Sequence, residues 1–331
     1  MTGRWRRLRR TLLLLPVFIL PALATLPAGA RAACAVNNPG AASLGAISSL
    51  EISQAGNHTE INTGFTCPGS LLSIVYPQTI QAQITAATGL TDTASGDTLP
   101  FAICQDSACA TQYAVGQTLT WQKTNLLDLL GLFGGPGGTL PLYVQVPSGN
   151  YNVAAGTYAG SITIRWSWSL CVLLGIGNLC LAPDTGSTTE TLVLSLTITA
   201  DCDIDAPNLN FGAAPLVSGF APVSQGLNVR CTRGSAYSVG LGDGGAYDGT
   251  SRRMQDPAGD FLRYEIYKQA GAERWGDQGT ARRASATADS NAGLLDGVTA
   301  QQFTYTAAIL TGQTTPPAGT YADTIVVDVQ F

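Results

Sequence analysis

The chain has 331 residues, of which 12% are charged, and its formal net charge is −5. A chain this acidic lacks the basic surface by which proteins bind nucleic acids or anionic lipids. It has a single histidine, His58, and no cysteine pair with zinc-ribbon spacing, so we expect neither a metal nor another cofactor.

Residues 1–32 have the composition of a cleaved signal peptide. A basic stretch from Arg4 to Arg10 precedes an apolar run from Leu12 to Leu26, and Ala30-Arg31-Ala32 provides a cleavage site. The segment holds six of the 17 basic residues and no acidic one, which leaves 11 basic and 22 acidic residues, a net charge of −11. No later stretch approaches the ~18 apolar residues of a spanning helix. We therefore expect export through the periplasm.

The cysteines indicate an oxidising compartment. All eight follow the predicted cleavage point: Cys34, Cys67, Cys104, Cys109, Cys171, Cys180, Cys202 and Cys231. An even number of cysteines in an exported chain is typical of disulfides.

An internal repeat divides the chain. Cys67-Pro-Gly-Ser70-Leu-Leu-Ser73 matches Cys231-Thr-Arg-Gly-Ser235-Ala-Tyr-Ser238 with one residue inserted, and Ala155-Gly-Thr-Tyr158 recurs as Ala318-Gly-Thr-Tyr321. The repeat predicts two related domains, 33–200 and 201–331. It also supports the disulfides Cys34–Cys67 and Cys202–Cys231, which leaves Cys104–Cys109 and Cys171–Cys180 by proximity.

Both copies have the sequence pattern of β-strands. Short alternating runs, separated by Gly, Pro, Asn and Ser, include Leu71 to Tyr76, Thr157 to Trp166, Leu262 to Tyr267 and Thr320 to Phe331. With a cysteine pair joining early strands, this pattern predicts an all-β chain of two immunoglobulin-like β-sandwich domains.

Two segments between predicted strands of the first copy are unusually apolar. They could fold back as a short helix and a covered hairpin, or stand out as apolar fingers, the second held by a Cys171–Cys180 disulfide. A weaker third candidate is the turn around Leu90. The predicted surface-binding residues are Leu126, Leu127, Leu129, Leu130, Leu132, Phe133, Val172, Leu173, Leu174, Ile176, Leu179 and Leu181.

The two copies end differently. The first adds a strand, Thr191 to Thr199, in which leucine and isoleucine alternate with mostly polar residues. The second reaches Phe331 directly after its Ala-Gly-Thr-Tyr strand, so we expect its sandwich to lack the strand that closes the first. An open sandwich exposes core side chains and unpaired backbone groups, which a strand from another chain can cover.

Separated motifs of the second copy occur in a characteristic order: Cys202, Asn210-Phe-Gly212, Cys231, Arg252-Arg-Met254, Leu262 to Tyr267, Trp275-Gly-Asp277 and Pro317-Ala-Gly-Thr-Tyr321. In this order they resemble the spore-coat-protein-U domain of archaic, Csu-type chaperone–usher pili. The resemblance implies a sandwich without its last strand. It would be capped first by a periplasmic chaperone and then by the N-terminal extension of the next subunit.

The resemblance also implies a place in the fibre. A polymerising subunit of that family carries its donor extension ahead of its first cysteine. Here the segment ahead of Cys202 would close the first domain, and about one residue of the mature chain precedes Cys34. This subunit would accept a donor strand but provide none, as a tip adhesin does. Its expected partners are the chaperone, the outer-membrane usher, the adjacent subunit and an apolar surface. Tip adhesins of this class are thought to present apolar finger loops, which favours exposure of the two segments.

Binding, and not catalysis, is therefore the expected activity. Residues 240–245 match a dinucleotide fingerprint, but no helical pattern follows them. His58 accompanies no nucleophile motif, which disfavours a secreted hydrolase. The alternatives are a non-adhesive structural pilus or outer-layer subunit, and a secreted protein that binds carbohydrate through Trp166 and Trp168.

Overall fold

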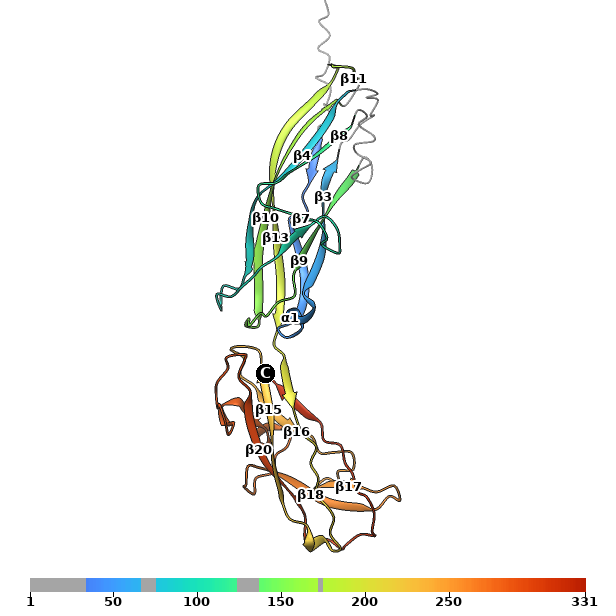
Figure 1. The fold of residues 1–331 in the computed structure, drawn as a ribbon, viewed down its shortest axis with the longest axis vertical. Coiled ribbons are helices and arrows are strands. Elements are labelled where there is room, and N and C mark those ends of the chain that lie inside the picture. Colours follow the sequence, from blue (N-terminus) through green and yellow to red (C-terminus); the bar gives the residue numbers. More distant parts are fainter. Residues whose placement is uncertain (1–33, 67–75, 124–136, 172–174) are drawn as a thin grey trace, which may run out of the picture.

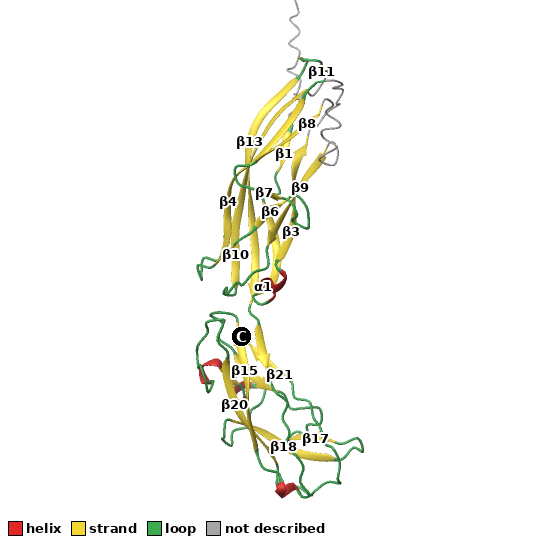
Figure 2. Cartoon of the chain, viewed as in Figure 1, coloured by secondary structure: helices red, strands yellow, loops and turns green. Residues whose placement is uncertain are grey.

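The computed structural model describes residues 34–66, 76–123, 137–171 and 175–331. The predicted signal peptide lies outside them. Among these described residues, helices are limited to α1 (Glu51–Ala55) and the 3-10 turns η1 (Val217–Gly219), η2 (Gly279–Ala281) and η3 (Ser285–Thr287), as Figure 2 shows. None of the described helices is long and apolar enough to cross a membrane. The prediction of an all-β chain of two sandwiches is confirmed, and the two halves lie end to end (Figure 1).

The first half is a sandwich of two sheets. One has the strand order β1 (Ala35–Asn37), β3 (Asn57–Thr66), β9 (Gly137–Val146), β6 (Ala102–Cys104) and β7 (Gln112–Tyr113). The other has the order β2 (Ala41–Ser48), β13 (Pro183–Thr199), β10 (Gly156–Cys171), β4 (Gln78–Thr91) and β5 (Thr98–Leu99), with β8 (Thr118–Lys123) also paired to β4.

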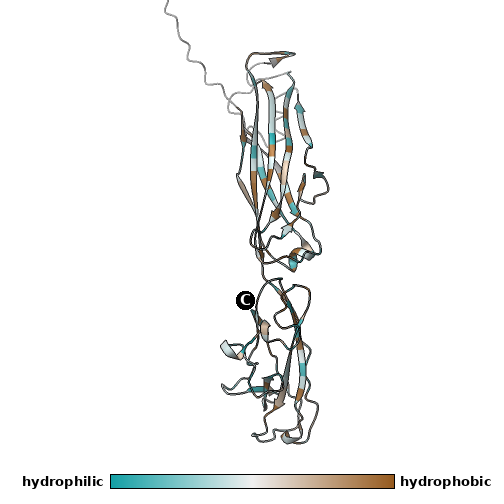
Figure 3. Ribbon diagram, turned by 90° about the vertical axis from the view of Figure 1, so that its left-hand side faces the viewer, coloured by the Kyte–Doolittle hydropathy of each residue, from teal (hydrophilic) through white to brown (hydrophobic). Residues whose placement is uncertain are grey.

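Alternation of side chains explains how these sheets close on one core. Hydrophobic and hydrophilic residues alternate along the strands of the first half (Figure 3), as expected when one face of each strand is buried. On β13, the inward residues are no more than 2% exposed: Leu192, Leu194, Leu196 and Ile198. This strand pairs antiparallel with β10 and parallel with β2, so it fills the space between them.

The predicted third finger around Leu90 is wrong. Leu90 lies within β4, which continues past a bulge to pair with β5, and its side chain is fully buried. Because the ladder extends through this point, the residues around Leu90 form a strand instead of a turn.

The second half has its own core around Trp275 and Phe303, both fully buried. Its larger sheet has the order β14 (Cys202–Asp205), β15 (Val223–Cys231), β20 (Gln301–Ile309), β18 (Phe261–Lys268) and β17 (Arg252–Gln255). Its smaller sheet has the order β19 (Arg283–Ala284), β16 (Ser238–Leu241) and β21 (Val327–Gln330).

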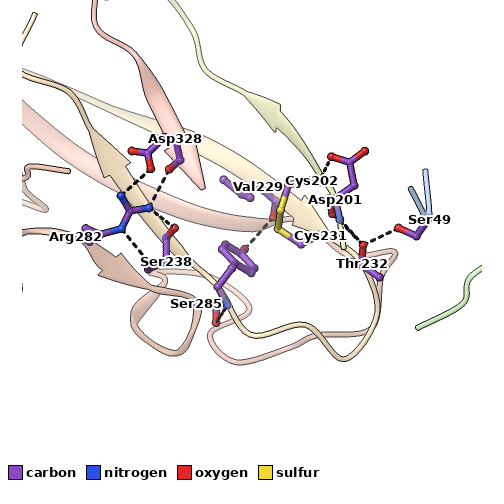
Figure 4. The surroundings of a disulfide bond; sticks show 11 residues. Ser49, Asp201, Cys202, Val229, Cys231, Thr232, Ser238, Arg282, Ser285 and Asp328 are labelled. Atoms are coloured by element: carbon purple, nitrogen blue, oxygen red, sulfur yellow. Dashed lines mark hydrogen bonds and ion pairs between the residues drawn. A yellow bond between two sulfur atoms is a disulfide. The ribbon is translucent and has the colours of Figure 1, made fainter. Parts of the chain in front are cut away.

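Three of the predicted disulfides are present: Cys104–Cys109, Cys171–Cys180 and Cys202–Cys231. Cys34 is also disulfide-bonded, and its predicted partner, Cys67, lies outside the described residues. Figure 4 shows Cys202–Cys231 beside the junction of the halves, where the hydroxyl groups of Ser49 and Thr232 lie 2.6 Å apart.

Candidate functional site

One edge of β21 is paired and the other is open. The strand pairs with β16 from Leu241↔Val327 to Ser238↔Gln330, and the Gly242 N–H donates to the Val326 carbonyl at 2.8 Å. Successive residues of an antiparallel strand direct their backbone groups to opposite sides. Those of Val327 and Val329 therefore point away from β16, toward a side where no strand lies among the described residues.

The open edge also explains why β21 is short. The sequence predicts a strand from Thr320 to Phe331, whereas the regular strand covers Val327–Gln330 only. Its counterpart in the repeat, β10, has neighbours on both sides and runs from Gly156 to Cys171. A strand paired on both edges is held in extended form over its whole length.

A groove of about 590 Å³ follows this open edge. One wall is formed by residues 320–327, and the opposite wall by residues 206–211, which follow β14. We call it the β21 groove. The buried side chains of Leu227 and Ile266 lie at its base. Its walls are lined by apolar side chains that are partly buried and pack against the core: Leu209, Phe211, Met254, Tyr321, Ile325 and Val327.

The first half shows what would fill such a groove. The repeat aligns Tyr158 with Tyr321 and Ile162 with Ile325. In the first half, Tyr158 faces Leu196 and Ile162 faces Leu192 on β13, and all of these are fully buried. Tyr321 and Ile325 remain half-buried beside the groove. The β21 groove thus occupies the position that β13 fills in the first half.

The second wall matches as well. On its other edge β13 pairs in parallel with β2, where Leu194 lies opposite Ala42. The first cysteines of the two copies are 168 residues apart, which aligns Ala42 with Asn210 in the wall of the groove. An added strand would therefore run antiparallel to β21 and parallel to residues 206–211.

A buried arginine holds β21 on the side that pairs with β16 (Figure 4). Arg282 forms an ion pair with Asp328 at 2.8 Å, and its Nη2 donates to the Ser238 carbonyl at 2.8 Å. Its side chain is only 6% exposed, so these contacts are shielded from water. They hold β21 against β16 while the opposite edge stays open.

The second candidate feature is an apolar hairpin at the end of the first half farthest from the second (Figure 1). It contains β11 (Gly175–Ile176) and β12 (Leu179–Cys180) and is closed by Cys171–Cys180. Three predicted surface residues, Ile176, Leu179 and Leu181, are 67%, 68% and 61% exposed. The remaining predicted residues lie outside the described ones: Leu126, Leu127, Leu129, Leu130, Leu132, Phe133, Val172, Leu173 and Leu174.

Other chemistry finds little support. In the part of the chain that the structure describes, no cluster of three or more His, Cys, Asp or Glu side chains is placed to hold a metal ion. Trp166 is fully buried, and Trp168 packs edge-on against Phe65 and donates to Asp184 at 3.1 Å. These indoles therefore do not form an exposed platform for sugars.

The comparisons with known proteins place this sandwich with an open edge in a family. The Spore Coat Protein U domain matches residues 21–165 and again residues 188–328. The chain therefore belongs to the Spore Coat Protein U domain family. It has the fold of a chaperone–usher pilus subunit, and the resemblance noted in the sequence is confirmed.

One solved structure is similar over nearly the whole chain. It is the CsuC–CsuE chaperone–tip adhesion subunit pre-assembly complex of the archaic chaperone–usher Csu pili of Acinetobacter baumannii. The identity is 27%, the TM-score is 0.63, and the match covers 90% of this chain and 100% of that one. The enterotoxigenic E. coli adhesin CfaE matches at 11% identity and a TM-score of 0.28, over 89% of this chain and 93% of that one, too distant to support an argument. No curated protein matches the chain.

Proposed function

We propose that this chain is the tip adhesin of a chaperone–usher pilus, with an adhesin domain in residues 33–200 and a strand-accepting domain in residues 201–331. The observation that carries the proposal is the open edge of β21 beside a groove of half-buried apolar side chains. A donor strand, first from a periplasmic chaperone and then from the neighbouring subunit, would cover that edge. The outer-membrane usher is the expected third partner.

The use of β13 supports a position at the tip. The second family match starts at residue 188, 14 residues ahead of Cys202. The segment before the cysteine is thus part of the family's domain. Before Cys202 that segment is β13, whose inward leucines are built into the core of the first half. It is not available to complete a neighbouring subunit. The similarity to a tip adhesion subunit supports the same position.

The apolar hairpin supports adhesion to apolar surfaces. Burying one leucine contributes roughly 1.5–3 kcal/mol, so a few exposed residues suffice for attachment without a pocket. Many pili acting together multiply the effect. The disulfide Cys171–Cys180 restricts the hairpin, so less conformational freedom is lost on contact. Binding, and not catalysis, is the proposed activity.

Capture by a chaperone tests the strand-accepting domain. The full chain is co-expressed in a periplasm with a tagged candidate chaperone, as wild type, as Val327→Arg and as Val326→Arg. Val327 lines the groove, whereas Val326, the residue just before β21, is 66% exposed and does not line it. We expect capture of the wild type and of Val326→Arg, and loss of Val327→Arg. Equal capture of both variants would contradict strand addition in this groove.

Attachment to plastic tests the adhesive role. Pili carrying Ile176→Ser, Leu179→Ser and Leu181→Ser together should assemble normally but attach poorly. Val115→Ser is the control, because Val115 is 56% exposed elsewhere on the first half. Unchanged attachment by the triple variant would favour the alternative of a non-adhesive structural subunit.

A further inference from the structure

One carboxylate interrupts the apolar lining of the β21 groove. Asp323 is the only acidic residue among the described residues that line it, and no basic residue lines it. The repeat aligns Asp323 with Gly160, a residue that has no side chain and faces the fully buried Leu194 of β13. At this position the two halves therefore present different chemistry to a covering strand.

The Asp323 side chain is held in place. Its Oδ1 accepts hydrogen bonds from the backbone N–H groups of Gly245 and Thr324, each at 2.8 Å, and its Oδ2 accepts one from the Tyr264 hydroxyl at 2.7 Å. Gly244 packs so closely that a Cβ atom there would collide with Oδ2. The pKa of Tyr264 is raised mainly by burial and secondly by the hydrogen bond to Asp323, so its hydroxyl stays protonated and acts as the donor.

These contacts leave the carboxylate short of one partner. Two carboxylate oxygens offer about four acceptor positions, and three are used. None of the ion pairs among the described residues involves Asp323. In the chain without an added strand the groove is open, and water can donate a hydrogen bond to the remaining acceptor position. A strand that covers the groove removes that water, and burying a charged oxygen without a replacement hydrogen bond is costly.

We propose that Asp323 selects the donor strand: the residue that faces it is a small side chain that donates a hydrogen bond, such as serine, and not a large aliphatic one. This inference rests on the proposed function and adds a sequence rule for the partner. By the register of β13, apolar residues would face Tyr321 and Ile325, as Leu196 and Leu192 face Tyr158 and Ile162. Between them, the position equivalent to Leu194 would carry the side chain that donates a hydrogen bond to Asp323.

Self-complemented chains test the rule. A copy of residues 188–199 is appended to the full chain after Phe331 through a short turn, so that it can fold back antiparallel to β21. Three versions carry Leu, Ser or Asp at the position copied from Leu194. Thermal unfolding of the second half is followed by the loss of hydrogen-exchange protection of amides in β20, a central strand of its larger sheet, as the temperature is raised. We expect the serine version to melt highest, at least about 4 °C above the leucine version, and the aspartate version to melt lowest.

The order of the three versions in the wild-type groove decides the inference without altering Asp323. Leucine equal to or above serine would overturn it. As a second measurement, Asp323→Asn should shrink the preference for serine, because an amide carries no charge to compensate. A fourth version with Asp in place of the copies of Leu192 and Leu196 separates the two proposals. If the other three versions melt at the same temperature as this fourth one, the groove takes no strand and the proposed function fails.

Discussion

The replacement Leu194→Ala tests whether β13 closes the first half. Leu194 is fully buried and lies between β10 and β2, opposite Gly160 and Ala42. Truncation of a buried leucine to alanine removes its transfer free energy and leaves a cavity, at a cost of about 2–5 kcal/mol. We expect the free energy of unfolding of the first half to fall by that amount.

The neighbouring residue provides a matched control. Val193 lies on the same strand but faces outward and is 48% exposed, so Val193→Ala should change stability by less than about 0.5 kcal/mol. The assay is urea unfolding of the chaperone-bound or self-complemented chain, read by hydrogen exchange of amides in β10. Equal effects of the two replacements would refute the role given to β13.

Three further predictions concern single features of the two halves. Glu190 is buried, its Oε1 accepts bonds from Thr63 and Trp166, and its Oε2 has no partner, so burial raises its pKa. The free energy of unfolding of the first half should therefore be highest at acid pH, where Glu190 is protonated, and should fall as pH rises through the raised pKa. In Glu190→Gln the unfolding midpoint should no longer fall over this pH range. Arg252→Leu removes the buried partner of Glu265 and leaves it only the more exposed Arg274, so it should cost the second half up to about 3 kcal/mol in urea unfolding. Replacing both cysteines of the hairpin disulfide by serine should weaken attachment to plastic and leave chaperone capture unchanged.

Each of these predictions has an opposing result. A wild type whose midpoint does not fall above pH 4.5, the ordinary pKa of a glutamate, would show that Glu190 is not held in an ionisation-disfavouring site. An Arg252→Leu chain as stable as wild type would mean that the buried ion pair contributes no more than apolar packing. Loss of chaperone capture after cysteine replacement would place the disulfide in folding of the whole chain.

The sequence predicted the architecture because repeats and alternation are local patterns. The anchors Cys67/Cys231 and Tyr158/Tyr321 aligned the halves, and the alternation of residues 191–199 identified the strand that only the first half contains. Three of the cysteine pairs followed from the repeat or from proximity.

The rest depended on contacts that no local pattern reports. The wall formed by residues 206–211 could have been found by aligning Asn210 with Ala42, but its place beside β21 follows only from the fold. The alignment of Tyr158 with Tyr321 places Asp323 at the position of Gly160, opposite a residue of the added strand, whereas its bonds to Tyr264 and Gly245 are long-range. The expected turn around Leu90 is absent because Gly89, a residue type that favours turns, lies here in a continuous strand.

Hydrogen exchange along the β21 groove tests the central claim most directly. Amides of residues 206–211 and 321–330 are compared in the full chain with and without the appended strand. Strand addition predicts strong protection of Val327 and Val329, whose backbone groups face the open edge, and little change at Asp328, which already pairs with Gly240 of β16. Unchanged exchange at Val327 and Val329 in the self-complemented chain would contradict the account.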